Sequence, residues 1–513
     1  MAPFGRCLVV GVTPFAQPNA ALVAGVARAG GLGVLDLGRD RGRALAALAD
    51  AARWVPESFG VRAGPGCPVS PADLPHEVDT VVLASGSLWT VADASGPSGN
   101  RTVLVEVCSA DEAGDALAAG AGGLIARGAE SGGRVGELTT FVLLQTLLAR
   151  VPSGVPVWAA GGIGLHTAAA AVAGGACGVV LDAQLALVRE SSLPREAAAA
   201  IAAMDGSETV VVGGHRVFTR PDLTVDSTGD VALRLGTDLR TELLPVGQDG
   251  AQARSLAERF VTAGGVVQAV QESIRTHLMA AAAGGGGLRH RVVQGPMTRV
   301  SDRAAFALAV AEGGGLPFLA LALMTGDEVR RLLTETAELL GDLPWGVGIL
   351  GFTPPEVREA QLAVVHEVRP PYALIAGGRP SQAAPLEAAG IATYLHVPSP
   401  GLLDRFLREG ARRFVFEGFE CGGHVGPRAS FPLWDTQIER LLAVPDAVPD
   451  LHVLFAGGIG DERSAAMVAA AAAPLSAAGA EVGVLMGTAY LFTEEAVAAG
   501  AILPGFQRAA VEC

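Results

Sequence analysis

The chain has 513 residues and a formal charge of −15, and all 37 of its basic residues are arginine. The absence of lysine excludes Schiff-base, pyridoxal-phosphate and P-loop nucleotide chemistry, because guanidinium stays protonated and cannot supply the amine that each of them needs. The acidic balance, with no basic cluster, argues against partners such as nucleic acid or an anionic membrane and favours small or acyl-type substrates.

The six cysteines are scattered without a CxxC pair, and the N-terminus has no basic segment followed by an apolar signal segment. We therefore expect a reduced, cytoplasmic protein. The segment Val151–Leu181 contains no Asp, Glu, Lys or Arg and is long enough to suggest a membrane span. Pro156 and the glycine pairs Gly161–Gly162 and Gly174–Gly175 interrupt it, however. This stretch is predicted to form strand, turn, helix and strand, and no membrane span.

Residues 1–200 contain eight short apolar runs separated by amphipathic or alanine-rich helical stretches. The runs lie near residues 7–11, 33–37, 59–63, 80–84, 103–107, 122–126, 156–160 and 177–181. Eight alternations of buried strand and helix, with glycines at the strand ends, predict a (β/α)8 barrel. An open doubly wound sheet is the competing prediction, but it usually has fewer strands.

Residues 201–287 form an insert, either a linker or a small lobe. Glu208–Phe218 (ETVVVGGHRVF) is a β-type run, and Ala251–Ala283 is a helical stretch. The glycines at Gly284–Gly287 indicate a flexible join to the segment that follows.

Residues 288–513 repeat the first pattern, with apolar runs near 292–295, 316–321, 346–350, 372–376, 392–397, 413–417, 452–456 and 482–486. Matching motifs keep their order: Pro14 with Pro296, the segment from Gly128 with that from Gly418, and Gly161–Gly164 with Gly457–Gly460. The spacing between matches grows along the chain, which indicates duplication of one unit followed by loop insertions in the second copy. The predicted fold is α/β, with two tandem (β/α)8 TIM-type barrels joined by a small inserted segment.

Glycine motifs follow the seventh and eighth apolar runs of the second copy, Ala456–Gly460 (AGGIG) and Met486–Thr488 (MGT). Loops at these two strand ends commonly hold a phosphate in such barrels. Glycine lets backbone N–H groups approach phosphate oxygens, and the Thr488 hydroxyl adds a donor. Either motif alone could be an ordinary tight turn, but two at consecutive strand ends favour a phosphate site.

The sixth apolar run leads into Glu417–Gly426 (EGFECGGHVG). With QGPM, which ends at Met297, and with AGGIG and MGTAYLFTEEA (Met486–Ala496), this segment resembles the nitronate monooxygenase and FMN-dependent enoyl reductase superfamily. Members of that superfamily include enoyl-reductase components of polyunsaturated fatty acid and polyketide synthases. The tandem repeat resembles the N-terminal region of polyketide synthase-like multienzymes, so further domains of a larger polypeptide are expected partners.

The resemblance implies an FMN at the mouth of the second barrel, with NAD(P)H as a possible reductant. The cofactor-binding residues that it implies are Pro296, Met297, Gly348, Gly422 and Gly423 beside the flavin ring, and Gly457, Gly458, Gly487 and Thr488 at the phosphate. The third strand of the family often ends with a polar residue, commonly asparagine, near the flavin, whereas this chain has Gly346–Ile349 (GVGI), so a side-chain contact is missing there. His424 holds the family's catalytic position, and an imidazole suits proton transfer near neutral pH. The alternative is a histidine satisfied by backbone within a glycine turn.

The first copy departs further from the family. Arg134 replaces the histidine, and Leu181–Ala183 (LDA) replaces MGT, which puts the Asp182 carboxylate where a phosphate would sit. Because like charges in a confined site repel, we expect this barrel to bind FMN weakly or not at all. It would then pack against the active barrel or shape its substrate entrance.

Other polar residues give weaker signals. Cys421 is predicted to be a small packing residue, since no base or low-pKa setting can be identified for it. The histidines His166, His290, His396 and His452 show no metal-ligand spacing, so no metal is predicted.

The predicted function is that of an FMN-dependent oxidoreductase whose second barrel reduces an enoyl thioester with NAD(P)H. In that reaction His424 would polarise the thioester carbonyl or assist protonation, and a carrier-protein-bound acyl chain is the expected substrate. One alternative is nitronate oxidation with O2, in which His424 takes the α-proton. Another is a non-catalytic docking or structural module. A phosphate-sugar isomerase is disfavoured because it would need carboxylates or lysine on other strands.

Overall fold

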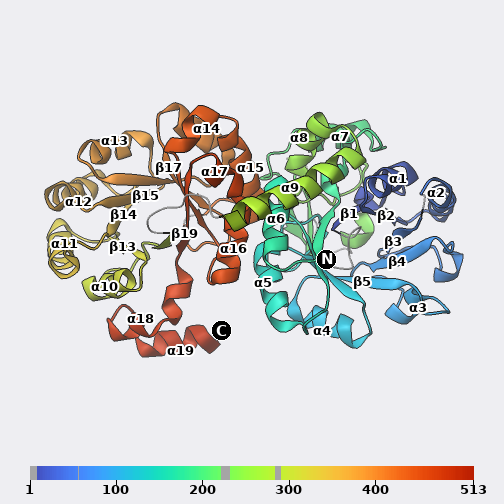
Figure 1. Cartoon of the computed structure of the whole chain (residues 1–513), viewed down its shortest axis with the longest axis horizontal. Helices are drawn as coiled ribbons and strands as arrows, with labels where there is room; N and C mark the ends of the chain where they lie inside the picture. Colours follow the sequence, from blue (N-terminus) through green and yellow to red (C-terminus); the bar gives the residue numbers. More distant parts are fainter. Residues whose placement is uncertain (1–7, 56, 221–230, 284–290, 424, 513) are drawn as a thin grey trace. The chain divides into compact units, whose positions relative to one another are not determined.

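The computed structural model describes residues 8–55, 57–220, 231–283, 291–423 and 425–512. The chain divides into two compact units, Met1–Met279 and Ala280–Cys513. Each unit holds a closed ring of parallel strands enclosed by helices (Figure 1). The prediction of two tandem TIM-type barrels is therefore confirmed.

The first barrel closes because its first strand pairs with both its second and its last strand. Its strands are β1 (Val9–Val12), β2 (Leu32–Asp36), β3 (Phe59–Ala63), β4 (Val78–Leu83), β5 (Thr102–Val107), β6 (Gly123–Arg127), β8 (Val157–Ala160) and β9 (Gly178–Leu181). Most of their residues are buried on both faces, as parallel strands under a layer of helices require. This burial explains why the sequence shows them as short continuous apolar runs.

Helices follow most of these strands, and polar residues cap several of their N-termini. They are α1 (Ala20–Arg28), α2 (Arg41–Trp54), α3 (Val91–Ser95), α4 (Ala110–Ala118), α5 (Thr140–Arg150) and α6 (Leu165–Ala173). The side chains of Asn19, Asp40 and Ser109 each accept a hydrogen bond from the first turn of α1, α2 and α4. These caps satisfy N–H groups that the helix itself leaves without a partner.

The described part of the insert packs on the first barrel. It contains α7 (Arg195–Ala202), the hairpin β10 (Thr209–Val212) and β11 (His215–Phe218), the 3-10 helix η6 (Gln248–Gln252), α8 (Ala253–Phe260) and α9 (Ala263–Ala283). The hairpin turns at Gly213 and Gly214, whose φ angles of 52° and 73° suit a type I′ turn. Strand β11 also pairs with β7 (Gly133–Arg134), in the loop after β6. The glycines predicted as a join, 284–287, lie outside the described residues.

The second barrel closes in the same way, through pairing of its first strand with its second and its last. Its strands are β12 (Val292–Gln294), β13 (Leu316–Ala320), β14 (Gly346–Leu350), β15 (Tyr372–Ala376), β16 (Ala392–His396), β17 (Arg413–Glu417), β18 (His452–Ala456) and β19 (Glu481–Met486). Each lies within a few residues of a predicted run.

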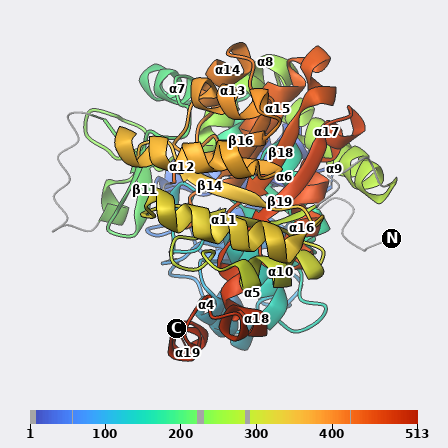
Figure 2. The ribbon, with the colours of Figure 1, turned by 90° about the vertical axis from the view of Figure 1, so that its left-hand side faces the viewer.

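The helices of the second unit surround this ring. They are α10 (Ala304–Glu312), α11 (Gly326–Leu340), α12 (Pro355–Val368), α13 (Pro380–Ala388), α14 (Pro400–Arg408), α15 (Ser430–Leu442), α16 (Glu462–Ala471), α17 (Ala473–Ala477), α18 (Glu494–Ala498) and α19 (Pro504–Glu512). Figure 2 shows α10, α11 and α12 side by side outside β14. Within the described residues, no helix combines the length and the apolarity needed to cross a membrane.

Apolar side chains fill the middle of each barrel. In the first, the inner cluster includes Val34, Val82, Leu104, Ile125 and Trp158, and in the second Phe318, Leu374, Tyr394, Val415 and Leu454. Side chains two residues further along a strand point the same way. Those further residues therefore line the mouth, which is the opening at the carboxyl ends of the strands where sites in such barrels form.

Candidate functional site

Strand register identifies equivalent mouth positions in the two barrels. Asp36 pairs with Arg62 as Ala320 pairs with Gly348, and Arg127 pairs with Ala160 as Glu417 pairs with Ala456. The last inward-facing positions of the first barrel are Asp36, Arg62, Ala84, Glu106, Arg127, Ala160 and Asp182, and those of the second are Ala320, Gly348, Ala376, His396, Glu417, Ala456 and Gly487. The first set is mainly charged and the second mainly glycine and alanine.

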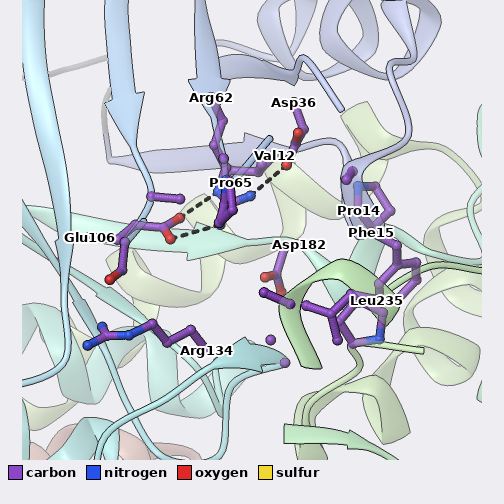
Figure 3. A pocket seen from close by; sticks show the side chains of 18 of the residues that line it. Val12, Pro14, Phe15, Asp36, Arg62, Pro65, Glu106, Arg134, Asp182 and Leu235 are labelled. Carbon is purple, nitrogen blue, oxygen red and sulfur yellow. Dashed lines mark hydrogen bonds and ion pairs between the residues drawn. The ribbon is translucent and has the colours of Figure 1, made fainter. Parts of the chain in front are cut away.

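A chain of alternating charges crosses the mouth of the first barrel. Arg62 lies between Asp36, at 2.6 Å, and Glu106, which it contacts at 2.7 and 2.9 Å (Figure 3). Arg127 continues the chain from Glu106, at 3.7 Å, to Asp182, at 3.1 Å. These side chains line a pocket together with His215, Leu235 and Pro245 of the insert. The charges are paired with one another, which offsets the cost of burying them.

The electrostatics of Glu106 follow from this arrangement. Burial alone would raise the pKa of its carboxyl, but the charges of Arg62 and Arg127 and the hydrogen bonds from Arg62 outweigh burial and lower the pKa to about 2. Glu106 is thus ionised over the whole physiological range. Arg134, which replaces the family histidine, is 2.5 Å from Glu112 and belongs to β7.

In the first unit, backbone N–H groups of the loops after β8 and β9 donate hydrogen bonds to side-chain oxygens of the same unit. The Gly162 N–H donates to Asp249 at 3.2 Å, the Asp182 N–H to Gln184 at 3.0 Å, and the Ala183 N–H to Asp182 at 2.5 Å. Asp249 comes from η6 of the insert and is 1% exposed. Burial and the neighbouring Asp182 raise the pKa of Asp249 well above its usual range. The donors that a phosphate would use are therefore already occupied.

In the second barrel, the loop after β19, which is equivalent to the loop at Asp182, keeps its donors. The N–H groups of Gly487 and Thr488 donate to no residue in the part of the chain that the structure describes. Gly457 and Gly458 have φ angles of 115° and 74°, which turn the backbone after β18 in a way that other residues rarely allow. Helix α16 begins just beyond, where the Gly460 and Asp461 N–H groups donate to Ser464 Oγ and the Ser464 N–H donates to Asp461 Oδ1. The N–H groups of Gly487 and Thr488 are therefore the donors that this end of the barrel can offer to an anion.

Several of the residues predicted to hold a cofactor meet at this mouth. A methyl group built on Gly348 would lie 2.2 Å from Pro296 Cβ, so Pro296 covers Gly348 directly. Met297 Sδ lies 3.6 Å from the equivalent point on Gly487. The structure thus brings together the loops after β12 and β19 with the end of β14.

The loop after β17 completes the rim. Gly422 and Gly423 have no described atom within 4 Å of where a Cβ would be, so the space above them is open. Cys421 packs near Gly457, and burial, with the charges of Glu417 and Glu420, raises the pKa of its thiol well above the usual range. This setting agrees with a packing role. His424, predicted to be catalytic, lies outside the described residues.

His396 and Glu417 are mouth residues to which the sequence assigned no role. His396 Nδ1 lies 2.9 Å from Glu417 Oε2, and their side chains are 13% and 9% exposed. Alternation along the predicted strands places both inward, so a residue-by-residue assignment of strand faces would have found them. Trp434, in α15 after the loop that follows β17, is a core residue whose indole N–H donates to Phe416 O.

The second mouth fits a flavin on two observations. Among the described residues, the N–H donors of Gly487 and Thr488 have no acceptor, as a phosphate site requires, and most inward-facing positions at the mouth are glycine or alanine, as the approach of a planar ring requires. Among the described residues, no group of three or more His, Cys, Asp or Glu side chains is placed to hold a metal ion. Fold and site together define a barrel oxidoreductase of the flavin-dependent class.

The chain belongs to the nitronate monooxygenase family, whose model matches residues 90–216 and 352–503. One match thus falls in each unit. This duplication agrees with the repeat seen in the sequence, and it confirms the predicted family resemblance.

Three characterised relatives resemble parts of the chain. Two are (3aS,4S,5R,7aS)-5-hydroxy-7a-methyl-1-oxo-octahydro-1H-indene-4-carboxyl-CoA dehydrogenases. The one from Rhodococcus jostii is 34% identical over 41% of this chain and 54% of its own length, and the one from Mycobacterium tuberculosis is 30% identical over 48% and 66%. Nitronate monooxygenase from Pseudomonas aeruginosa is 26% identical over 41% of this chain and 69% of its own length. The chain thus matches about half to two thirds of the two dehydrogenases.

Two solved structures are also similar. FabK from Thermotoga maritima aligns with a TM-score of 0.46 at 24% identity, over 54% of this chain and 96% of its own. Nitroalkane oxidase from Streptomyces ansochromogenes aligns with a TM-score of 0.42 at 21% identity, over 53% and 97%.

Proposed function

We propose that the second barrel binds one FMN at its mouth and reduces an enoyl thioester with NAD(P)H. The observation that carries this proposal is the contrast between the two mouths. The first mouth is crossed by its own ion pairs and its loop donors are occupied by carboxylates, whereas the second has mainly small residues and, within the described part of the chain, two N–H donors without acceptors, those of Gly487 and Thr488. Bound FMN would supply hydride transfer from the nicotinamide to the substrate double bond.

The phosphate would be held by backbone donors and one hydroxyl. The N–H groups of Gly487 and Thr488 are available, and Gly457 and Gly458 turn the chain so that the backbone can approach. Because the chain has no lysine, no ammonium can neutralise the phosphate, which makes the N–H groups of Gly487 and Thr488 more important. Pro296, Met297, Gly422 and Gly423 would border the ring.

His424 is the proposed catalytic residue. By its place in the family motif, its imidazole would donate a hydrogen bond to the thioester carbonyl oxygen or assist protonation of the α-carbon. The developing negative charge on the substrate would then be met by a donor that can also exchange a proton near neutral pH.

The thioester assignment rests on the relatives. Two of them are named for a carboxyl-CoA substrate, so a thioester is a chemical feature that this family can accept. A carrier-protein-bound acyl chain presents the same thioester. Nitronate oxidation with O2 is the second candidate, favoured by the family match and by the relative from Pseudomonas aeruginosa.

Anaerobic spectroscopy distinguishes the two reactions. The purified protein, supplied with FMN, is mixed without oxygen with NADPH, NADH or a nitronate, and the flavin absorbance is followed. Rapid bleaching by a nicotinamide and recovery on adding an enoyl-CoA are expected. Bleaching by a nitronate alone would establish the second candidate. A chain that binds no FMN would support a docking or structural module instead.

The His424→Ala variant tests the catalytic assignment. Turnover with the enoyl thioester is expected to fall about 100- to 10,000-fold, the range for loss of a general acid–base group. Flavin content should stay unchanged, because the phosphate donors lie on other loops. Full turnover in this variant would show that His424 has no catalytic role.

A further inference from the structure

The segment that follows β12 is held by a buried hydrogen-bond network centred on Ser301. The Ser301 hydroxyl accepts hydrogen bonds from Gln294 Nε2 at 2.7 Å and from the Met297 N–H at 2.9 Å, and it donates to Gly295 O at 3.2 Å. A hydroxyl has one proton to donate and two lone pairs, so all of its hydrogen-bonding capacity is used. Ser301 and Gln294 are only 2% and 1% exposed, so water does not compete for these bonds.

Backbone bonds to the same residues restrain an uncommon turn. The N–H groups of Val300 and Ser301 both donate to Met297 O, at 3.0 and 2.8 Å, and the Ala320 N–H at the end of β13 donates to Ser301 O at 2.8 Å. Within this turn Arg299 has a φ of 64°, in the left-handed region that residues other than glycine rarely adopt. Such a conformation persists where the surrounding bonds determine it. The path of the chain from Met297 to Ser301 is therefore fixed by its own contacts.

Pro296 and Met297 are the residues that this network places at the mouth of the second barrel. They lie against the end of β14 and the loop after β19, where they are proposed to border the flavin ring. Gln294 follows Val293, which belongs to the inner cluster of the barrel, so alternation along the strand points the Gln294 side chain outward. Gln294 and Ser301 thus support the segment from behind, outside the ring of strands.

The first barrel lacks the side chain on which this network depends. Strand register places Gly11 at the position of Gln294, and a Cβ on Gly11 would lie 2.6 Å from Val26 Cγ2, so even a methyl group there would have to displace Val26. The Asp36 N–H donates to the Thr13 hydroxyl at 2.8 Å, whereas the equivalent N–H of the second barrel donates to a backbone carbonyl of the turn. The network therefore belongs to the barrel whose mouth keeps open backbone donors.

We propose that Ser301 is a positioning residue for the flavin ring: its hydroxyl, supported by Gln294, holds Pro296 and Met297 in the arrangement that binds the ring. This inference rests on the proposed function. A segment that is ordered before its ligand arrives loses less conformational freedom on binding, so the network raises affinity without touching the ligand. Because the phosphate is assigned to donors in the loop after β19, this contribution concerns the ring and not the phosphate.

The test compares dissociation constants for FMN and for riboflavin, which has the same ring without the phosphate, in the full chain and in Ser301→Ala. Both constants are expected to rise about tenfold in the variant, the order of magnitude for one lost buried hydrogen bond. Their ratio should stay unchanged. Ser301→Thr keeps the hydroxyl and should restore most of the affinity for both flavins. A rise for FMN alone would contradict the assignment of this network to the ring.

Thr336→Val is the matched control for a general loss of stability. Thr336 lies in the second half of α11, is fully buried, and donates its hydroxyl to Leu332 O at 2.7 Å, so this variant also loses a buried hydroxyl. Its dissociation constants for both flavins should equal those of the unaltered chain. Equal losses of flavin affinity in Ser301→Ala and Thr336→Val would overturn the positioning role.

Hydrogen exchange at the Met297 amide, measured without flavin, tests the network itself. Exchange should be faster in Ser301→Ala, because the amide loses its acceptor, and unchanged exchange overturns the proposal. Should Ser301→Ala lose its fold, Gln294→Leu takes its place: weaker binding of both flavins is expected, and unchanged constants overturn the proposal.

The unaltered chain separates the possible failures. If it binds FMN and Ser301→Ala binds both flavins equally tightly, the role of Ser301 is wrong while the proposed function stands. If it binds neither flavin, both are wrong. If riboflavin binds too weakly to measure, the FMN constants decide alone, and equal values in the unaltered chain and Ser301→Ala overturn the proposal.

Discussion

At the scale of single residues, Gly487 and Asp182 show how little separates the two sites. They follow the eighth strand of their barrels with similar backbone angles, φ −116° and ψ −83° for Gly487 and φ −132° and ψ −80° for Asp182. The difference between them is therefore the side chain rather than the path of the chain. A carboxylate at this point repels a phosphate and occupies a backbone donor.

The Gly487→Asp variant should therefore lose flavin without losing its fold. The dissociation constant for FMN is expected to rise at least about 100-fold, since like charges brought together at a binding site cost several kcal/mol. Titration of the purified variant with FMN, followed by flavin fluorescence, measures this change.

Gly487→Ala is the matched control for that variant, because it adds a Cβ that would meet, among the described residues, only Met297 at ordinary contact distance. Its affinity should stay much closer to that of the unaltered chain. Equal losses in the two variants would show that space, and not charge, limits this position.

Glu106 is the centre of the charge chain in the first barrel, and its replacement by glutamine should destabilise that unit. Loss of one partner from a buried ion pair costs about 3–5 kcal/mol in the free energy of unfolding at neutral pH. Because the folded pKa of about 2 lies below the usual 4.5, this stabilisation is present above about pH 4.5 and is lost as the pH falls toward 2.

Urea unfolding at several pH values, with hydrogen exchange read on β5 and β6 peptides, measures this effect. The gap between Glu106→Gln and the unaltered chain should be largest near neutral pH and close as the solution is acidified. A gap that widens in acid would contradict the ion-pair explanation.

At the scale of elements, the insert supplies contacts that occupy a backbone donor at the mouth of the first barrel. The sequence predicted a β-type run and a helical stretch there, and the structure shows β10, β11, α8 and α9. It could not predict that β11 pairs with β7 across the loop after β6, or that η6 places Asp249 on Gly162. Such contacts join segments about 80 residues apart, and no local periodicity encodes them.

Strands and helices were the predictable part of both barrels. Buried strands appear as apolar runs because both of their faces are covered, and glycines mark the turns at their ends. The His396–Glu417 and Arg62–Glu106 contacts depend on register between neighbouring strands. Register follows from closure of the whole barrel, so the glycine motifs were found from the sequence and these pairs were not.

Removing the insert's contact with the glycine loop gives a third prediction. Asp249→Ala removes the acceptor of the Gly162 N–H and one of the two acceptors of the Gln184 amide, which also donates to Ile163 O, and should destabilise the first unit by about 1–3 kcal/mol. Asp249→Asn keeps an acceptor oxygen and should cost less. Hydrogen exchange at the Gly162 amide reports the lost bond directly, and unchanged exchange in Asp249→Ala would rule out this contact.

At the scale of the whole molecule, one duplicated unit has produced two different mouths. Both copies keep the closed eight-stranded ring, and both match the same family. Within the described residues, the second keeps open backbone donors in the loop after its eighth strand, whereas the first uses the equivalent donors to bind its own side chains. The absence of lysine makes that difference decisive, because no ammonium can compensate for a lost N–H donor.

The count of flavins per chain tests this account most directly. The full chain is saturated with FMN, freed of excess cofactor, and its flavin absorbance is compared with its protein concentration, with Gly487→Asp measured in parallel. One FMN per chain, lost in that variant, is the predicted result. Two per chain, none, or one that remains in Gly487→Asp would contradict the assignment of the flavin to the second barrel.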